Sequence, residues 1–165
     1  MMREKTKQFL MNEADTRAFI EANTLLRMGM IDEKGLPYVV PLNYVFMNGA
    51  FYIHGANEGK KIEALRARAD VCLEIDEMYG FVYDETGGRK CGVSTSYRSV
   101  IAMGKAFFVA EESEKRAALD LFVEKCAPEL VGAEMPAAAV QATMVIKVVC
   151  EEVTGKAYHI DDISK

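Results

Sequence analysis

The sequence predicts a protein of the mostly-β (β+α) class, built as a six-stranded antiparallel β-barrel with peripheral helices. Residues 71–76 alternate between apolar and more polar side chains, which is typical of a half-buried strand. Asn48-Gly49 lies between two apolar runs and favours a two-residue hairpin, because both residues accept a positive φ. The predicted helices fall between hairpins rather than between successive strands, so the βαβ rhythm of a parallel sheet is absent.

The expected elements of the first half follow one another closely. Phe19 and Ile20 face inward on a short helix, and the turn 32–35 separates the first two strands. Proline cannot donate to a strand ladder, so Pro41 indicates an edge or a bulge in the second strand. The expected elements are a helix over 15–23, strands over 24–31, 36–47 and 50–55, and a helix over 59–69.

The second half combines a long strand with a longer helix. Gly104 lies in the middle of the strand and indicates a bulge or a sharp bend. The helix that follows has Leu119, Phe122 and Cys126 on one face. The expected elements are a strand over 71–76, a loop or irregular hairpin over 79–91, a strand over 94–110, a helix over 112–126, a connection over 128–136 and a last strand over 141–153.

Length and composition favour one globular domain over residues 1–165, in which half the residues are apolar and 27% are charged. Twenty basic and twenty-five acidic side chains leave a net charge of −5. This balance argues against nucleic acid or an anionic membrane as the main partner, because phosphate binding depends on basic excess. The sequence shows neither a signal peptide nor an apolar run long enough to cross a membrane, so we expect a cytoplasmic protein.

Four scattered cysteines and two histidines do not form a zinc site of usual spacing. We therefore expect no metal. Because a chain of this length needs no disulfide to be stable, we interpret the cysteines as reduced thiols.

The segment 51–61 carries the clearest indication of a ligand. A strand ends at Gly55, and a short loop leads into a helix with Lys60 and Lys61 in its first turn. Two cations are unfavourable there, because the free N–H groups of a helix N-terminus already carry partial positive charge. A bound phosphate would reverse that balance. The alternative is that both lysines are solvated and partly offset by Glu58.

Other polar candidates each have a structural alternative. His54 precedes the candidate phosphate loop and shares a strand face with Tyr52, so it is either a catalytic residue or a structural histidine. Asn43 lies among apolar residues, so we expect a buried amide that requires hydrogen-bond partners, which a ligand or the backbone would provide. The hydroxyl-rich run 94–99 belongs to an edge strand or offers donors to a ligand. Glycine motifs of phosphate loops, dinucleotide sites and nucleophile elbows are absent.

Together, residues 24–156 resemble the flavin-binding split barrels related to pyridoxamine 5′-phosphate oxidase, and within them the nitroimidazole-resistance (Nim-type) branch. The resemblance rests on the order and spacing of several short windows. These are PYVVPLNY at 37–44, YIHG at 52–55, EGKKI at 58–62, YRSVI at 97–101 with Gly104, and TGK at 154–156.

The resemblance implies a split barrel and a homodimer with FMN at the subunit interface. The FMN phosphate would lie on the two lysines, the strand 40–44 along the isoalloxazine, and Arg98 and Ser99 in the cofactor site from the same or the partner subunit. Open strand edges near Pro41 and at 94–99 also favour a dimer. The implied cofactor-binding residues are Val40, Pro41, Leu42, Asn43, Tyr44, His54, Gly55, Lys60, Lys61, Ser96, Arg98 and Ser99, with His54 as the candidate catalytic residue.

Two departures disfavour pyridoxamine-phosphate oxidase activity. The oxidases carry an Arg-Gln-Val-Arg pattern where this chain has Arg98-Ser99-Val100-Ile101, so the second arginine is absent here. They also carry a C-terminal arginine and tryptophan, whereas this chain has no Trp and no arginine after Arg116. The hypotheses that remain are an FMN-dependent reductase of a small electrophile such as a nitroaromatic, with His54 as proton donor, and a non-catalytic flavin or haem carrier.

Overall fold

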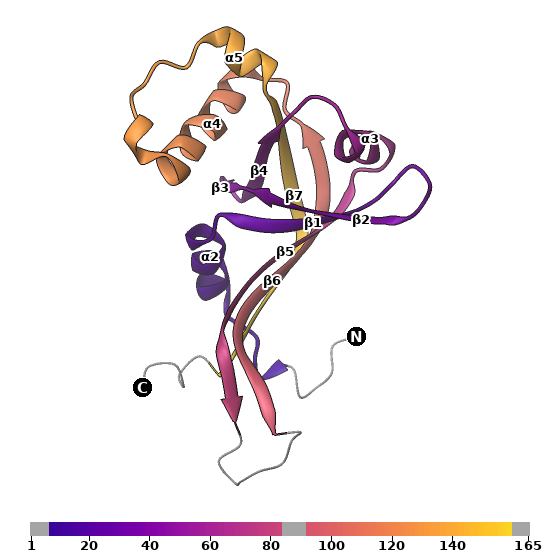
Figure 1. The fold of residues 1–165 in the computed structure, drawn as a ribbon, viewed down its shortest axis with the longest axis vertical. Coiled ribbons are helices and arrows are strands. Elements are labelled where there is room, and N and C mark those ends of the chain that lie inside the picture. Colours follow the sequence, from indigo (N-terminus) through magenta and orange to yellow (C-terminus); the bar gives the residue numbers. More distant parts are fainter. Residues whose placement is uncertain (1–6, 84–91, 160–165) are drawn as a thin grey trace.

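The computed structural model describes residues 7–83 and 92–159, shown in Figure 1. The strands are β1 (Leu25–Ile31), β2 (Pro37–Asn43), β3 (Val45–Met47), β4 (Ala50–Gly55), β5 (Asp70–Tyr83), β6 (Val93–Phe108) and β7 (Met144–Tyr158). The helices are α2 (Glu13–Ala22), α3 (Lys60–Ala67), α4 (Glu112–Cys126), α5 (Ala137–Ala142) and the 3-10 turn η1 (Pro128–Leu130).

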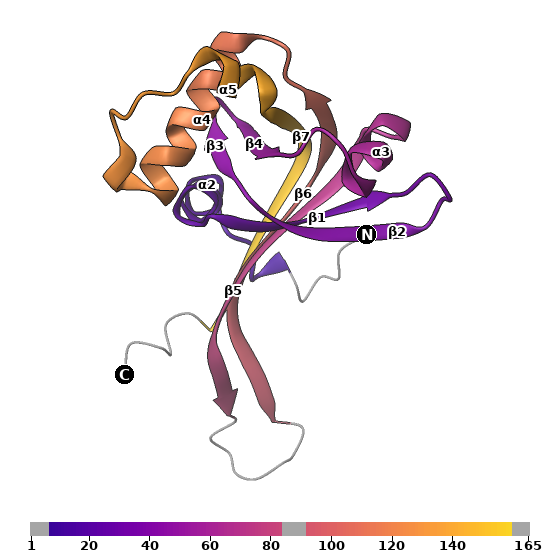
Figure 2. The same cartoon turned by 45° about the horizontal axis from the view of Figure 1, so that its top comes forward.

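All these strands belong to one antiparallel sheet, in the order β2-β1-β5-β6-β7-β4-β3. The sheet curls into a half-barrel, with α4 and α5 together on the side of β3 and β4 (Figure 2). The predicted split-barrel class is confirmed. The described residues form seven strands rather than the six expected.

The additional strand arises at Tyr44, where the single strand expected over 36–47 divides. β2 pairs with β1 at one edge of the sheet, whereas β3 pairs with β4 at the opposite edge. Tyr44 itself is fully buried, and its hydroxyl donates to the Ile20 carbonyl over 2.6 Å. The hairpin predicted at Asn48-Gly49 joins β3 to β4, with φ angles of 53° and 78° at these two residues.

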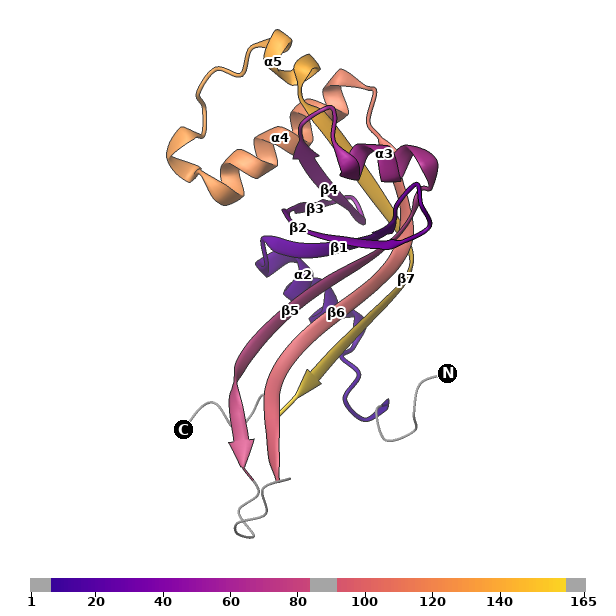
Figure 3. The ribbon, with the colours of Figure 1, turned by 45° about the vertical axis from the view of Figure 1, so that its right-hand side comes forward.

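Strand β5 is longer than expected, because the segment after Tyr79 continues as strand as far as Tyr83. It pairs with β6 along this length, with an irregularity between Met78 and Gly80. The two strands project from the half-barrel as an arm (Figures 1 and 3). The rest of the expected irregular hairpin, including Cys91, lies outside the described residues.

The long strand expected over 94–110 is confirmed as β6, and its register shifts between Met103 and Gly104 as the glycine indicated. A Cβ atom on Gly104 would lie 2.2 Å from the Val149 carbonyl oxygen, so only glycine fits this close approach. Within the run 94–99, residues 97–99 lie between β5 and β7, whereas residues 94–96 pair with β5 alone, so the expected edge strand is confirmed only for the first half of the run. The last strand begins later than expected, at Met144, after α5.

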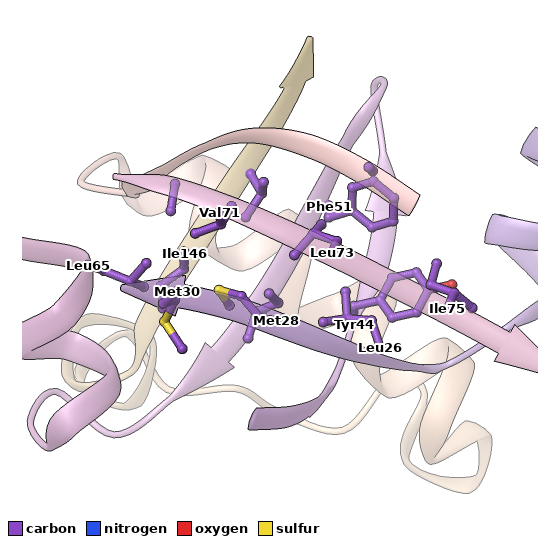
Figure 4. Close-up of a cluster of buried hydrophobic side chains, with 14 of the residues drawn as sticks. Leu26, Met28, Met30, Tyr44, Phe51, Leu65, Val71, Leu73, Ile75 and Ile146 are labelled. Carbon is purple, nitrogen blue, oxygen red and sulfur yellow. The ribbon is translucent and has the colours of Figure 1, made fainter. Parts of the chain in front are cut away.

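Two clusters of buried side chains hold the fold together. The larger fills the concave side of the half-barrel, where Figure 4 shows residues of β1, β4, β5 and α3 converging. Its members include Leu26, Met28, Tyr44, Phe51, Ile62, Leu65, Leu73 and Ile146. The smaller packs α4 and α5 against β3, β4 and β7, and includes Val45, Tyr52, Leu119, Phe122 and Val145. Cys126 is exposed, because the buried face of α4 ends at Phe122.

Candidate functional site

The outer edge of β2 carries backbone groups that none of the described strands satisfies. Tyr44 N–H donates to the Thr24 carbonyl, and Asp32 N–H donates to the Leu36 carbonyl, so the even-numbered residues of β2 face β1. The odd-numbered residues therefore direct their backbone groups away from the sheet. These outward groups are the carbonyls of Pro37, Val39, Pro41 and Asn43 and the N–H groups of Val39 and Asn43.

Side chains of β2 alternate between the two faces of the sheet. Val40 and Leu42 are half-buried against the core, whereas Pro41 and Asn43 face outward and are exposed. The expectation of a buried Asn43 amide is therefore wrong, because the alternation of β2 directs this side chain away from the core. The Asn43 amide nitrogen donates to the Thr24 carbonyl over 3.2 Å, so part of its hydrogen-bonding capacity is met by the backbone. Any ligand beside β2 would therefore meet mainly its backbone edge.

Helix α3 begins between β2 and β4, and its two lysines diverge. Lys60 Nζ lies 3.1 Å from Asp32 Oδ2 and 4.5 Å from the centre of the Tyr38 ring, which belongs to β2. Lys61 Nζ extends toward β4 and lies 3.1 Å from the position that a Cβ atom on Gly55 would occupy. We call this region the β2–β4 seam: the free edge of β2, His54 and Gly55 at the end of β4, and the first turn of α3.

Lys61 is a half-buried cation, and burial lowers its pKa. Within the described part of the chain, no carboxylate lies within ion-pair distance of its Nζ. Removing an ammonium group from water without a partner is costly. The environment of Lys61 therefore favours an anion beside it.

His54 lies on the outer face of β4, under helix α4. Its ring meets the Phe122 ring edge-on, with 4.3 Å between centroids. Burial, and then the positive charge of Lys61, lower the pKa of His54 below its usual 6.5. The side chain is exposed, and Lys61 is close enough to act on its charge.

The predicted residues on β6 lie elsewhere. Arg98 lines an open cleft of about 790 Å³ with Phe19 and Glu77, and none of the cleft residues comes from β2, β4 or α3. Ser99 points to the opposite face, between Asp76 and Lys156 of the neighbouring strands. Ser96 is buried, and its hydroxyl donates to the His159 carbonyl over 2.6 Å. One subunit thus brings His54, Gly55, Lys60 and Lys61 together without these three residues.

Sequence reasoning missed two groups around the seam. Asp32 was assigned only to a turn, although its carboxylate is the partner of Lys60. Phe122 was assigned only to a buried helix face, although it forms the wall against which His54 packs. The turn residues 32–35 and the apolar face of α4 were visible in the sequence, but their partners lie far away along the chain.

Three cysteines are free thiols, at positions 72, 126 and 150, and the fourth lies outside the described residues. Over residues 7–83 and 92–159, no three His, Cys, Asp or Glu side chains are placed to hold a metal ion. No helix in the same ranges is long and apolar enough to span a membrane.

A family model described as pyridoxamine 5′-phosphate oxidase matches residues 12–157. No curated protein matches the chain. Among solved structures, a candidate 5-nitroimidazole antibiotic resistance protein from Bacteroides thetaiotaomicron is 28% identical, with a TM-score of 0.75, over 89% of this chain and 85% of that one.

Two further structures share the fold at lower identity. The flavocytochrome Anf3 from Azotobacter vinelandii has a TM-score of 0.80 at 23% identity, over 94% of this chain and 74% of its own. An FAD- and haem-binding protein from Mycobacterium smegmatis has a TM-score of 0.78 at 17% identity, over 90% of this chain and 72% of that one.

Proposed function

Because the chain belongs to the pyridoxamine 5′-phosphate oxidase family, we propose that it is a flavoprotein that binds FMN at the β2–β4 seam and reduces a small electrophile such as a nitroaromatic compound. The observation that carries the proposal is the half-buried Lys61, which has no carboxylate partner among residues 7–83 and 92–159, beside the free backbone edge of β2. The likeness to a candidate nitroimidazole resistance protein supports the choice of substrate class.

The free edge of β2 fits the polar rim of an isoalloxazine ring. That rim carries both hydrogen-bond donors and acceptors, and the outward groups of β2 include both kinds of partner: N–H donors on Val39 and Asn43, and carbonyl acceptors that include that of Pro41. Backbone groups held in a sheet are already ordered, so little entropy is lost when a ligand binds them.

The start of α3 fits a phosphate. A phosphate beside Lys61 would neutralise a half-buried cation and would accept from the first N–H groups of the helix. Gly55 leaves room for this side chain, because any larger residue there would meet Lys61 Nζ.

A bound flavin would supply the hydride chemistry. His54 is the residue of this chain placed to donate a proton to a reduced substrate, because its ring is partly exposed beside the seam. Phe122 fixes the orientation of the imidazole. The chain lacks the second arginine and the C-terminal tryptophan noted above, so we do not propose oxidation of pyridoxamine phosphate.

We also propose a homodimer that completes the site. Val39, Gly29, Cys72 and Met103 are successive cross-strand partners on the outer face of the sheet, and Ile101 lies in the next row. Val39 is 60% exposed, Met103 47% and Ile101 41%, so this face presents an apolar row to solvent, and the Arg27–Glu74 ion pair lies in the adjacent row with Ile101. Ser99 lies on this outer face with Ile101 and Met103, so a second copy that covers the face would also bring Ser99 toward the flavin of its partner, whereas Arg98 lies on the opposite face.

The test is the visible spectrum of the purified protein, followed by anaerobic turnover. A flavin spectrum that is bleached by dithionite or a nicotinamide and restored by a nitroimidazole supports the proposal. A flavin that does not react with the nitroimidazole leaves only a carrier role. A haem spectrum, or the absence of binding to added FMN, would contradict the proposal.

A further inference from the structure

Asp32 is a buried carboxylate that organises the turn between β1 and β2. Its side chain is 5% exposed. Oδ1 accepts from the backbone N–H groups of Lys34, over 3.0 Å, and Leu36, over 2.8 Å. Gly35 completes the turn with a φ of 78° and donates to the Asp32 carbonyl. The turn therefore uses one carboxylate oxygen and leaves the other available.

The remaining oxygen, Oδ2, is the ion-pair partner of Lys60 Nζ. The Tyr38 ring lies under the same ammonium group. Backbone hydrogen bonds and Lys60 together hold the pKa of Asp32 below its usual 3.8. Both partners of Lys60 thus belong to the β1–β2 hairpin, and Lys60 connects this hairpin to α3.

The two neighbouring lysines consequently have different surroundings. Successive residues of a helix point about 100° apart, so one side chain reaches the hairpin while the other reaches the end of β4. Lys60 already has a carboxylate, whereas Lys61 has none among the residues that the structure describes. A phosphate at the seam would compete with Asp32 for the first lysine but not for the second.

This contact of Lys60 with the hairpin stabilises the position of β2, because among the described strands β2 is hydrogen-bonded to β1 only. Its position relative to α3 sets the width of the seam. Figure 3 shows α3 above the turn that joins β1 and β2, where the Asp32–Lys60 contact lies.

We propose that Lys60 is a positioning residue that acts through Asp32 to hold the free edge of β2 at a fixed distance from α3, and that Lys61 alone supplies the charge for the phosphate. The inference rests on the proposed binding of FMN. The sequence pattern assigned phosphate binding to both lysines. The inference assigns it to Lys61 and gives Lys60 a positioning role.

The test compares the binding of FMN with that of riboflavin, which lacks the phosphate, in five single variants. Lys61→Met should weaken FMN binding about 10- to 100-fold and leave riboflavin unchanged. Lys60→Met and Asp32→Asn should weaken both ligands by the same factor, so that the FMN-to-riboflavin ratio stays at its wild-type value. Asp32→Asn is a sharp probe, because an asparagine Oδ1 still accepts both turn hydrogen bonds while the contact to Lys60 is lost.

Lys34→Met removes an exposed lysine from the same turn and serves as the control for net charge. Lys60→Arg should restore both affinities. The inference is overturned if Lys60→Met lowers the FMN-to-riboflavin ratio as much as Lys61→Met, or if Asp32→Asn binds both ligands as wild type does. Failure of the proposed function looks different, because the wild-type protein would then bind neither ligand.

Discussion

Tyr52 and Glu114 join strand β4 to helix α4. The Tyr52 hydroxyl donates to Glu114 Oε1 over 2.6 Å, and Lys147 Nζ donates to the same oxygen over 2.8 Å. Tyr52 is fully buried, so its hydroxyl has no access to water as an alternative partner. Because α4 also carries Phe122, this contact holds the wall of the His54 site in place.

Lowering the pH should weaken this contact. The hydrogen bonds from Lys147 and Tyr52 hold the pKa of Glu114 below its usual 4.5. A carboxylate with a lowered folded-state pKa stabilises the fold above its unfolded-state pKa, and the contribution is lost as the pH falls through the folded-state value. In urea denaturation at neutral pH, the free energy of unfolding of Glu114→Gln should be about 1 kcal/mol lower than that of wild type. This difference between the two proteins should shrink below about pH 4.

Glu124→Gln is the matched control, because Glu124 is exposed on the same helix and has no ion pair in the described part of the chain. Its free energy of unfolding should follow that of wild type at both pH values. A difference between Glu114→Gln and wild type that does not change with pH would contradict the assignment.

Replacing His54 by alanine should separate cofactor binding from turnover. If His54 donates the proton, the variant binds FMN normally and reduces a nitroimidazole about 100-fold or more slowly in a single turnover. Because burial lowers the pKa of His54, the donor form is lost as the pH rises, so the wild-type rate should increase from about pH 7 to pH 6 and the variant rate should not. Equal rates for the two proteins would assign His54 a packing role only.

Disrupting the outer face of the sheet should abolish the proposed dimer. Met103→Glu places a second carboxylate beside Glu152 at the β6 end of the exposed apolar row, and burying it without a partner would oppose association. Sedimentation should show a dimer for wild type and a monomer for the variant. Val131→Glu, at an exposed apolar position between α4 and α5, should remain dimeric. A stable wild-type monomer at micromolar concentration with cofactor bound would refute the dimer.

Gly104→Ala should destabilise the protein strongly. The new Cβ would lie 2.2 Å from the Val149 carbonyl oxygen and 2.8 Å from Cys150 Cα, which are backbone atoms of β7. Relieving that overlap requires moving one strand from the next, and we expect a loss of about 3 kcal/mol in the free energy of unfolding. Gly29→Ala is the control, because its Cβ would lie 3.5 Å from the Cys72 carbonyl oxygen, an ordinary contact.

Much of the fold could be predicted from local sequence patterns. The alternation over 71–76 and the Asn48-Gly49 turn depend on neighbouring residues only, and both appear where expected. The division at Tyr44 was not visible, because no glycine or proline lies between Leu42 and Met47 and the mostly apolar run is interrupted only by Asn43. Which edge each half joins is decided by pairing with β1 and β4, which is a long-range choice.

In the candidate site, too, the features that depend on local sequence could be predicted, and the long-range contacts could not. Lys60 and Lys61 were found from the start of a helix, a local feature. Asp32 was not connected to them, because the ion pair joins segments that meet only after the half-barrel has closed. The direction of Ser96, toward the His159 carbonyl and not toward solvent, depends on the last strand lying beside β6.

The prolines of β2 have a consequence for self-association. An open strand edge is a template on which another chain can add a strand, and such addition leads to aggregation. Pro37 and Pro41 both occupy outward positions of this edge, so two of its four outward residues cannot donate to an incoming strand. A small molecule needs only one or two donors and can still bind. The same edge is thereby open to a ligand and closed to polymerisation.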